Sequence, residues 1–290
     1  MDSLQIKNIY WQKQWKIPGT SWQICGFSRS AYRTGFYITE LDLMLDAGPQ
    51  NFSKPKTILI THSHIDHLAC LPLTMLGDVH SGHIFEIYGP KVAKDYIENY
   101  IKSMFEVNAL ANMRNTNFYK YNGLEMRAQD PFKLPMNKNN MEIAVFECDH
   151  GIPTVSYGLS EIKTKLKEEF IGLSGKEIGK LRADGVNISK EVIYKRLAYI
   201  CDTSISVFDL NPDILNYSVI FIECTFFMDD ELDNAISTKH IHWQTLKPYV
   251  LNNPQITFML FHFSQRYPDK IIGNFFQKEV DAGIRNLNWW

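Results

Sequence analysis

Residues 57–67 read Thr57-Ile58-Leu59-Ile60-Thr61-His62-Ser63-His64-Ile65-Asp66-His67, an apolar run that ends in three histidines and an aspartate. Such a cluster is rare in a core because burying an unpaired polar group is costly. Side chains alternate in an extended chain, so His62 and His64 point to the same side as the chain leaves the predicted strand. Asp66 and His67 can then reach a neighbouring point. Two nitrogen ligands for one metal ion, beside an oxygen and a nitrogen ligand for a second, suit zinc, and iron or manganese also accept such ligands. The alternative, a polar loop that happens to be rich in histidine, explains the constrained spacing less well.

Three further apolar runs end at a residue that can bind a metal. Residues 145–150 end at His150, residues 198–202 at Asp202, and residues 258–262 at His262. In layered α/β folds, functional sites lie where buried strands meet loops. Taken singly, His150 or His262 would more often be a core histidine with satisfied hydrogen bonds. Together with residues 62–67, we predict that they are ligands.

The order of these motifs resembles that of the metallo-β-lactamase superfamily along nearly the whole chain. Residues 43–48 resemble its first motif, whose aspartate (Asp46 here) orients the metal loop from behind. The resemblance implies an α/β fold of four layers, an αββα sandwich, and two metal ions. It also implies a metal-bridging hydroxide as the nucleophile, because two cations lower the pKa of the water between them. The implied ligands are His62, His64 and His150 for one ion, Asp66, His67 and His262 for the other, and Asp202 for both.

The final motif resembles one branch of this superfamily. Residues 260–267, Leu260-Phe261-His262-Phe263-Ser264-Gln265-Arg266-Tyr267, are similar to the His-Phe-Ser-x-Arg-Tyr signature of ribonuclease Z, the endonuclease that trims tRNA 3′ ends. Residues 221–226 resemble its His-Glu-Ala-Thr-Phe strand, and residues 237–242 fall where it has a His-Ser-Thr loop. Ile65 and Ile222 stand where this branch usually has Gly and His, so the chain resembles a divergent short form.

Cleaving a phosphodiester requires a nucleophile, stabilised phosphoryl charge and a proton for the leaving oxygen. We predict that His240 gives this proton, since an imidazole can carry a proton near neutral pH, and that Glu223 orients it. Asp66 is a predicted catalytic residue as well as a ligand. The alternative for His240 is an ordinary surface histidine, and its neighbour His242 is predicted to begin a helix. Arg266 either binds a phosphate oxygen or ties the last strand to the sheet.

Residues 161–196 carry nine Lys/Arg and six Asp/Glu, a net charge of +3 within a chain of net charge −2. This segment lies where the resemblance implies a short substrate-binding arm. Lys163, Lys165 and Lys167 would there contact the phosphates of tRNA. The alternative is a solvated helix with paired charges. The overall charge does not by itself indicate a nucleic-acid-binding protein.

Length and composition predict a single domain, residues 1–290, because 45% hydrophobic content is enough to bury a large core. The five cysteines are odd in number and mostly lie in apolar runs, which favours reduced thiols and a cytoplasmic location. We expect Cys201 in the core, since it alternates with Asp202. We expect neither a signal peptide nor a membrane span. A homodimer is an open expectation.

Apolar periodicity predicts alternating strands and helices. The expected strands lie near residues 21–26, 34–46, 57–61, 83–88, 141–149, 154–161, 196–202, 218–226 and 255–262, and the expected helices near 66–76, 90–106, 242–252 and 268–280.

The predicted function is that of a zinc-dependent phosphodiesterase or endoribonuclease that processes tRNA 3′ ends. A small-molecule hydrolase with the same metals, acting on a cyclic phosphodiester, lactone or thioester, is the alternative. The 59 residues between Asp202 and His262 are too few for the large helical insert of other nuclease branches of this superfamily.

Overall fold

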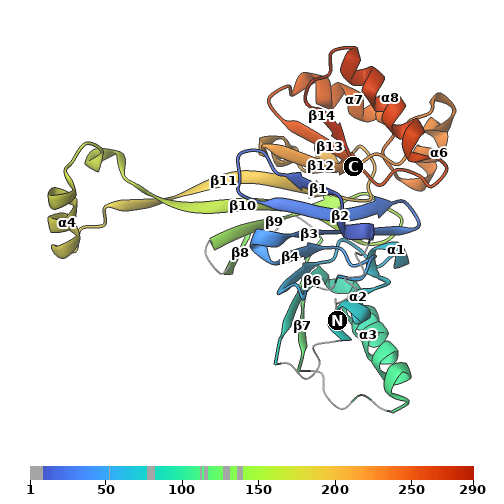
Figure 1. The fold of residues 1–290 in the computed structure, drawn as a ribbon, viewed down its shortest axis with the longest axis horizontal. Helices are drawn as coiled ribbons and strands as arrows, with labels where there is room; N and C mark the ends of the chain where they lie inside the picture. The colour runs from blue at the N-terminus through green and yellow to red at the C-terminus, as the bar shows by residue number, and fades with distance from the viewer. Residues whose placement is uncertain are drawn as a thin grey trace, which may run out of the picture.

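Two β-sheets packed face to face form the centre of the molecule (Figure 1). The structure, a computed structural model, describes residues 9–290 except 52, 77–81, 112, 114–116, 127–130 and 136–139. The first sheet has the order β1 (Gln14–Lys16), β2 (Gln23–Arg29), β3 (Arg33–Ile38), β4 (Leu43–Leu45), β5 (Thr57–Leu59), β6 (Phe85–Pro90) and β7 (Tyr119–Leu124). The second has the order β14 (Leu287–Trp289), β13 (Thr257–Phe261), β12 (Val219–Glu223), β11 (Ser189–Ile200), β10 (Thr154–Leu166), β9 (Asn140–Cys148) and β8 (Phe132–Pro135).

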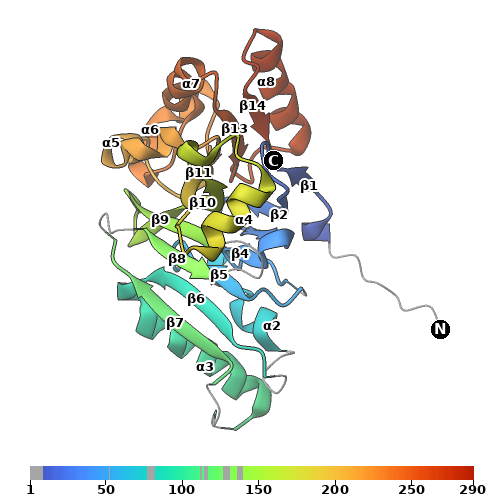
Figure 2. The same cartoon turned by 90° about the vertical axis from the view of Figure 1, so that its left-hand side faces the viewer.

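Helices cover the outer face of each sheet, as Figure 2 shows. Two apolar clusters hold these helices to the sheets, one beneath α2 and α3 and one beneath α5, α7 and α8. The predicted four-layer αββα arrangement is therefore confirmed. The helices are α1 (Ile65–Leu68), α2 (Leu71–Met75), α3 (Lys94–Ala109), α4 (Gly175–Ala183), α5 (Val207–Leu210), α6 (Leu232–Thr238), α7 (Trp243–Asn252) and α8 (Asp269–Asp281).

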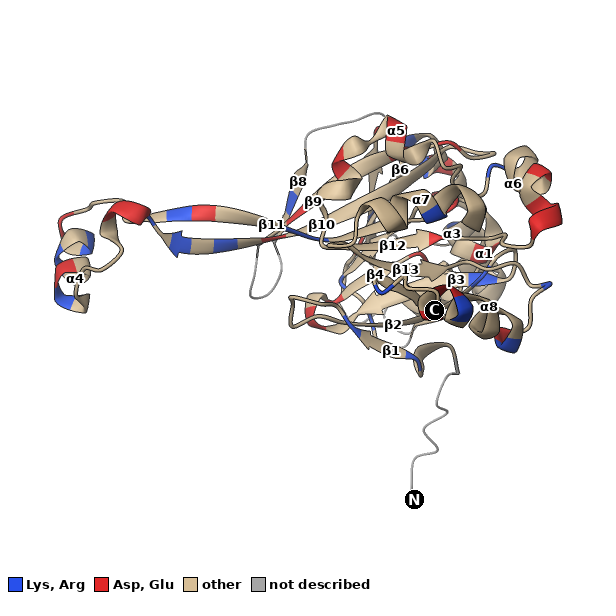
Figure 3. Ribbon diagram, turned by 90° about the horizontal axis from the view of Figure 1, so that it is seen from above, with Lys and Arg blue, Asp and Glu red and all other residues tan. Residues whose placement is uncertain are grey.

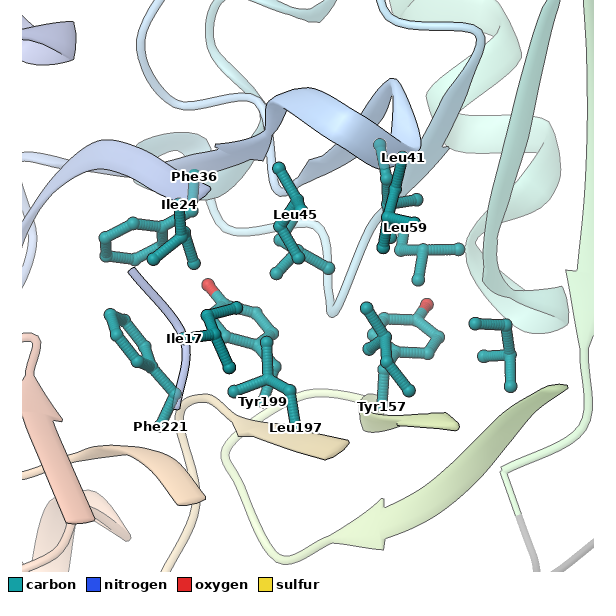
Figure 4. Close-up of a cluster of buried hydrophobic side chains, with 14 of the residues drawn as sticks. Ile17, Ile24, Phe36, Leu41, Leu45, Leu59, Tyr157, Leu197, Tyr199 and Phe221 are labelled. Carbon is teal, nitrogen blue, oxygen red and sulfur yellow. The ribbon is translucent and has the colours of Figure 1, made fainter. Parts of the chain in front are cut away.

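The main core lies between the two sheets (Figure 4). Phe36 of β3 is fully buried there, and its ring centroid lies 4.9 Å from that of Phe221 and 5.3 Å from that of Phe261, both on the second sheet. Edge-to-face aromatic pairs of this kind add to the stabilisation from burial alone. They fix the separation of the sheets at whose edge the histidines lie.

Parallel pairing brings the ends of several strands to one edge. β4, β5 and β6 run parallel in the first sheet, and β11, β12 and β13 run parallel in the second. The residues that follow β5, β11 and β13 therefore leave their sheets in similar directions, which is where layered folds build sites.

Several element boundaries differ from the sequence-based expectation. The strand expected at 34–46 is two antiparallel strands, because the turn at Thr39–Leu41 ends at Asp42 with φ +50°. The helix expected at 66–76 is interrupted at Cys70. Pro90 ends β6 instead of opening a helix. The short strands β1, β7, β8 and β14 were not expected, since short, partly polar strands lack a clear periodic signal.

β10 and β11 extend well beyond the sheet as a long hairpin that carries α4 at its far end (Figures 1 and 3). Their pairing continues from Tyr157↔Tyr199 to Leu166↔Ser189. A capping box at Ser174 and Glu177 begins α4. Among the described residues, none of the helices is long and apolar enough to cross a membrane.

Candidate metal centre

Four side chains gather around one point at the edge of the sandwich. His62, His64, His150 and Asp202 each offer one ligand atom, and these atoms all lie within 4.8 Å of one another. His64 Nδ1 lies 3.0 Å from His62 Nε2 and 3.3 Å from His150 Nε2. Asp202 Oδ2 lies 3.6 Å from His62 Nε2 and 3.7 Å from His150 Nε2. The structure thus brings together the first set of predicted ligands.

A second group adjoins the first. Asp66 Oδ2 lies 3.5 Å from His67 Nε2 and 3.7 Å from His262 Nε2. Asp202 Oδ1 lies 3.6 Å from His67 Nε2 and 3.1 Å from His262 Nε2. The two carboxylate oxygens of Asp202 therefore face different groups, which is the arrangement that a bridging ligand requires.

The hydrogen bonds behind the histidines determine which ring nitrogen faces the centre. Thr61 Oγ1 donates to Asp46, so His62 Nδ1–H must donate to Thr61 Oγ1, 2.9 Å away. Thr225 Oγ1 likewise donates to Glu223, and His262 Nδ1 lies 3.1 Å from it. Each imidazole is thereby held with its Nε2 lone pair toward the centre, as metal ligands need.

His67 and His150 are held in the same way. His67 Nδ1 lies 3.1 Å from Asp46 Oδ2, and His150 Nδ1 lies 3.4 Å from the carbonyl oxygen of Lys239. Four rings thus present Nε2 to the centre. Within the part of the chain that the structure describes, the buried Nε2 atoms of His67 and His262 have no hydrogen-bond partner.

Unpartnered buried nitrogens are costly unless a ligand satisfies them. Burial and the neighbouring His67 hold the pKa of His62 well below its usual value. Burial raises the pKa of Asp202, but His262 and His67 outweigh it and hold that pKa well below its usual range. Burial lowers the pKa of His67, but Asp202, Cys201 and Asp46 outweigh it and raise that pKa, so a cation that binds there would displace a proton. A neutral imidazole and an ionised carboxylate are the forms that bind metal. The donor set of imidazoles and carboxylates therefore fits two divalent cations.

His240 and Glu223 lie beside these two groups. His240 Nδ1 is 2.8 Å from Glu223 Oε1, and its ring centroid is 5.0 Å from that of His150 and 5.6 Å from that of His262. Burial lowers the pKa of His240, but the Glu223 carboxylate outweighs it and raises the pKa to about 9. His242 instead accepts a hydrogen bond from the backbone of Gln244, so it begins α7 as predicted.

The remaining predicted residues lie outside this cluster. Arg266 is exposed and pairs with Glu231, with 2.9 Å between Nη1 and Oε1. Lys163 pairs with Glu161 at 3.1 Å on the projecting hairpin, Lys165 lies on the same strand, and Lys167 directly follows its last residue, Leu166. The structure therefore tests neither of the two roles considered for Arg266, nor RNA contact by the lysines.

Cys201 is fully buried in the core, as expected from alternation. Its sulfur nevertheless lies 3.3 Å from Asp202 Oδ1, because the strand ends at Ile200 and strict alternation does not continue beyond it. Burial and the charge of Asp202 raise the pKa of the Cys201 thiol well above its usual value, so it stays protonated. Sequence reasoning did not identify Thr225, Lys239 or Tyr199. Their partners at the site, His262, His150 and Asp46, lie far from them in the chain.

Comparison with known proteins agrees with this fold. No protein-family model matches the chain. The metallo-β-lactamase fold protein YhfI of Bacillus subtilis superposes with a TM-score of 0.60 and 14% identity, covering 91% of this chain and 93% of that one. The short form of human tRNase Z superposes with a TM-score of 0.55 and 15% identity, covering 91% and 94%. The chain is therefore a metallo-β-lactamase fold protein.

Within that fold, the sequence points to one branch. The chain is 28% identical over 267 residues to tRNase Z TRZ1 of Arabidopsis thaliana, covering 90% of this chain and 91% of the relative. The resemblance to ribonuclease Z that the sequence motifs predict is confirmed.

Proposed function

We propose that this chain is a metal-dependent endoribonuclease that cuts tRNA precursors at the 3′ end. The observation that carries the proposal is the pair of ligand groups joined by the two oxygens of Asp202, with the His240–Glu223 pair beside them. The similarity to tRNase Z over nine-tenths of the chain supports the substrate class. A hydrolase of small cyclic phosphodiesters, lactones or thioesters is the second candidate, since the same groups suit those reactions.

The proposed ligands are those expected from the sequence, and zinc is the proposed ion. Two bound cations supply an activated water and neutralise charge on the phosphoryl oxygens. His64, His62 and His150 would hold one cation, Asp66, His67 and His262 the other, and Asp202 both.

His240 is proposed to protonate the leaving oxygen. Its Nδ1 is engaged by Glu223, which leaves Nε2 to deliver a proton. A pKa of about 9 keeps this imidazole protonated at neutral pH, as a general acid requires. Asp66 is proposed to position the attacking water in addition to its role as a ligand. Arg266, Lys163, Lys165 and Lys167 are proposed to contact the RNA backbone.

The test is an assay of one purified protein with four substrates: a tRNA precursor, bis-nitrophenyl phosphate, a lactone and a thioester. We expect a cut just 3′ of the discriminator nucleotide that leaves a 3′-hydroxyl on the tRNA. His64→Ala and Asp202→Ala should lose activity together with bound metal. Turnover of the lactone or thioester with an uncut precursor would favour the second candidate instead.

A reducing, cytoplasmic location is also proposed. All five cysteines, each among the described residues, are buried and unbridged. A homodimer stays a proposal, and light scattering of the purified protein would measure its mass.

A further inference from the structure

Two tyrosines of the second sheet cross the core toward the first sheet (Figure 4). Tyr157 of β10 and Tyr199 of β11 are both fully buried. Tyr157 OH donates to the carbonyl oxygen of Ile60, 2.5 Å away. Tyr199 OH donates to Asp46 Oδ2, 3.0 Å away. The two hydroxyls thus make the same kind of inter-sheet contact, but only Tyr199 reaches a side chain behind the metal loop.

Asp46 depends on its partners for its conformation. Its φ of +57° lies in the left-handed region, which is costly for a residue other than glycine. Thr61 N–H donates to Asp46 Oδ1 at 2.8 Å, and the Thr61 hydroxyl lies within 3.0 Å of both carboxylate oxygens. Oδ2 also accepts from Tyr199 OH and faces His67 Nδ1. The orientation of the His67 ring is therefore set by a carboxylate that Tyr199 helps to hold.

Tyr199 also lies on β11, which ends at Ile200, and Asp202 follows two residues after that end. The Tyr199 side chain therefore links β11 of the second sheet to Asp46 of the first, and Asp46 in turn contacts His67. His67 belongs to the second ligand group, Asp202 faces both groups, and His62, His64 and His150 belong to the first. Losing this link should disturb the second group more than the first.

We propose that Tyr199 is a positioning residue for the second cation, acting through Asp46 on His67. The proposal rests on the metal site described under Proposed function. Residues behind the ligands of a metal commonly change its affinity by about 10–100-fold when they are removed. We therefore expect Tyr199→Phe to weaken one of two metal-binding steps by about that factor and to leave the other unchanged.

Tyr157→Phe is the matched control, since it removes an equally buried hydroxyl that bonds to a main-chain oxygen instead. Both variants lose one buried hydrogen bond, so urea unfolding should show similar losses of stability. Zinc titration of the metal-free proteins, in competition with a chelating dye, distinguishes the two variants. Two unchanged steps in Tyr157→Phe beside one weakened step in Tyr199→Phe would support the proposal.

A double-mutant cycle tests whether Tyr199 affects zinc binding through Asp46. If Tyr199 acts through Asp46, then Tyr199→Phe should weaken zinc binding little further once Asp46→Asn is present. Additive effects would overturn the proposal, as would equal titrations of the two tyrosine variants. A wild-type protein that binds no zinc would overturn the proposed metal site as well, which distinguishes the two failures.

Discussion

Glu223 is a buried carboxylate whose contacts explain how a histidine beside a metal site can stay protonated. Burial raises its pKa, but His240 outweighs this and lowers it, so the group is ionised although its side chain is inaccessible. Its oxygens also accept the backbone N–H of Thr203 and the hydroxyl of Thr225. The charge is therefore fixed within 2.8 Å of the imidazole.

Glu223→Gln should move the alkaline limb of the rate–pH profile to lower pH. A general acid works while it is protonated, so the rate falls as the pH rises through the pKa of His240. Removing the negative charge lowers that pKa, by about one to three units for a charge so close. Metal analysis should show equal metal content in both proteins, so that the difference isolates Glu223. An unchanged limb in a variant with full metal content would contradict the proton-donor role.

At this scale the sequence identifies the side chains that gather at the candidate site but not the residues that support them. His62, His64 and Asp66 follow a strand at a spacing that suits metal binding. Tyr199 and Lys239 have no such local pattern, because their partners lie 153 and 89 residues away in the chain. Only the paired sheets bring them together.

The projecting hairpin of β10 and β11 is the element that the sequence pattern described least well. The expected strands ended near 161 and began near 196, where apolar alternation stops. Beyond those points both faces are exposed, and the strands are held by pairing with each other instead of by a core. Lys163, Lys165 and Arg196 gather around the ring of Tyr194 (Figure 3 shows the charges along the hairpin).

Replacing Lys163, Lys165 and Lys167 together by Gln should weaken binding of a tRNA precursor and flatten its dependence on salt. Each lost phosphate contact lowers the salt slope by about one. Hydrolysis of bis-nitrophenyl phosphate should be unchanged, since the hairpin projects away from the metal groups. The matched control replaces Lys91, Lys102 and Lys120, which are exposed but lie on the body. Equal RNA binding by both triple variants would exclude the hairpin as the contact.

The two sheets of the molecule are joined through the core and meet again at the candidate metal centre. His62 and His64 come from the loop after β5 in the first sheet, and Asp66 and His67 come from α1, which directly follows that loop. His150, Asp202 and His262 come from loops of the second sheet. Bound cations would therefore link the sheets at one edge, in addition to the aromatic contacts around Phe36.

Removing metal should therefore lower the stability of the entire fold. An unfolded chain does not hold these ligands together, so a cation present at 1,000 times its dissociation constant stabilises the folded state by about 4 kcal/mol. For a domain of this size, that corresponds to a fall of about seven degrees in the melting midpoint after chelation. Differential scanning calorimetry with zinc and after chelation measures the difference, and Asp202→Ala is the control that should show almost none. If the melting midpoint of the wild-type protein did not change after complete removal of zinc, no cation would join the two sheets here.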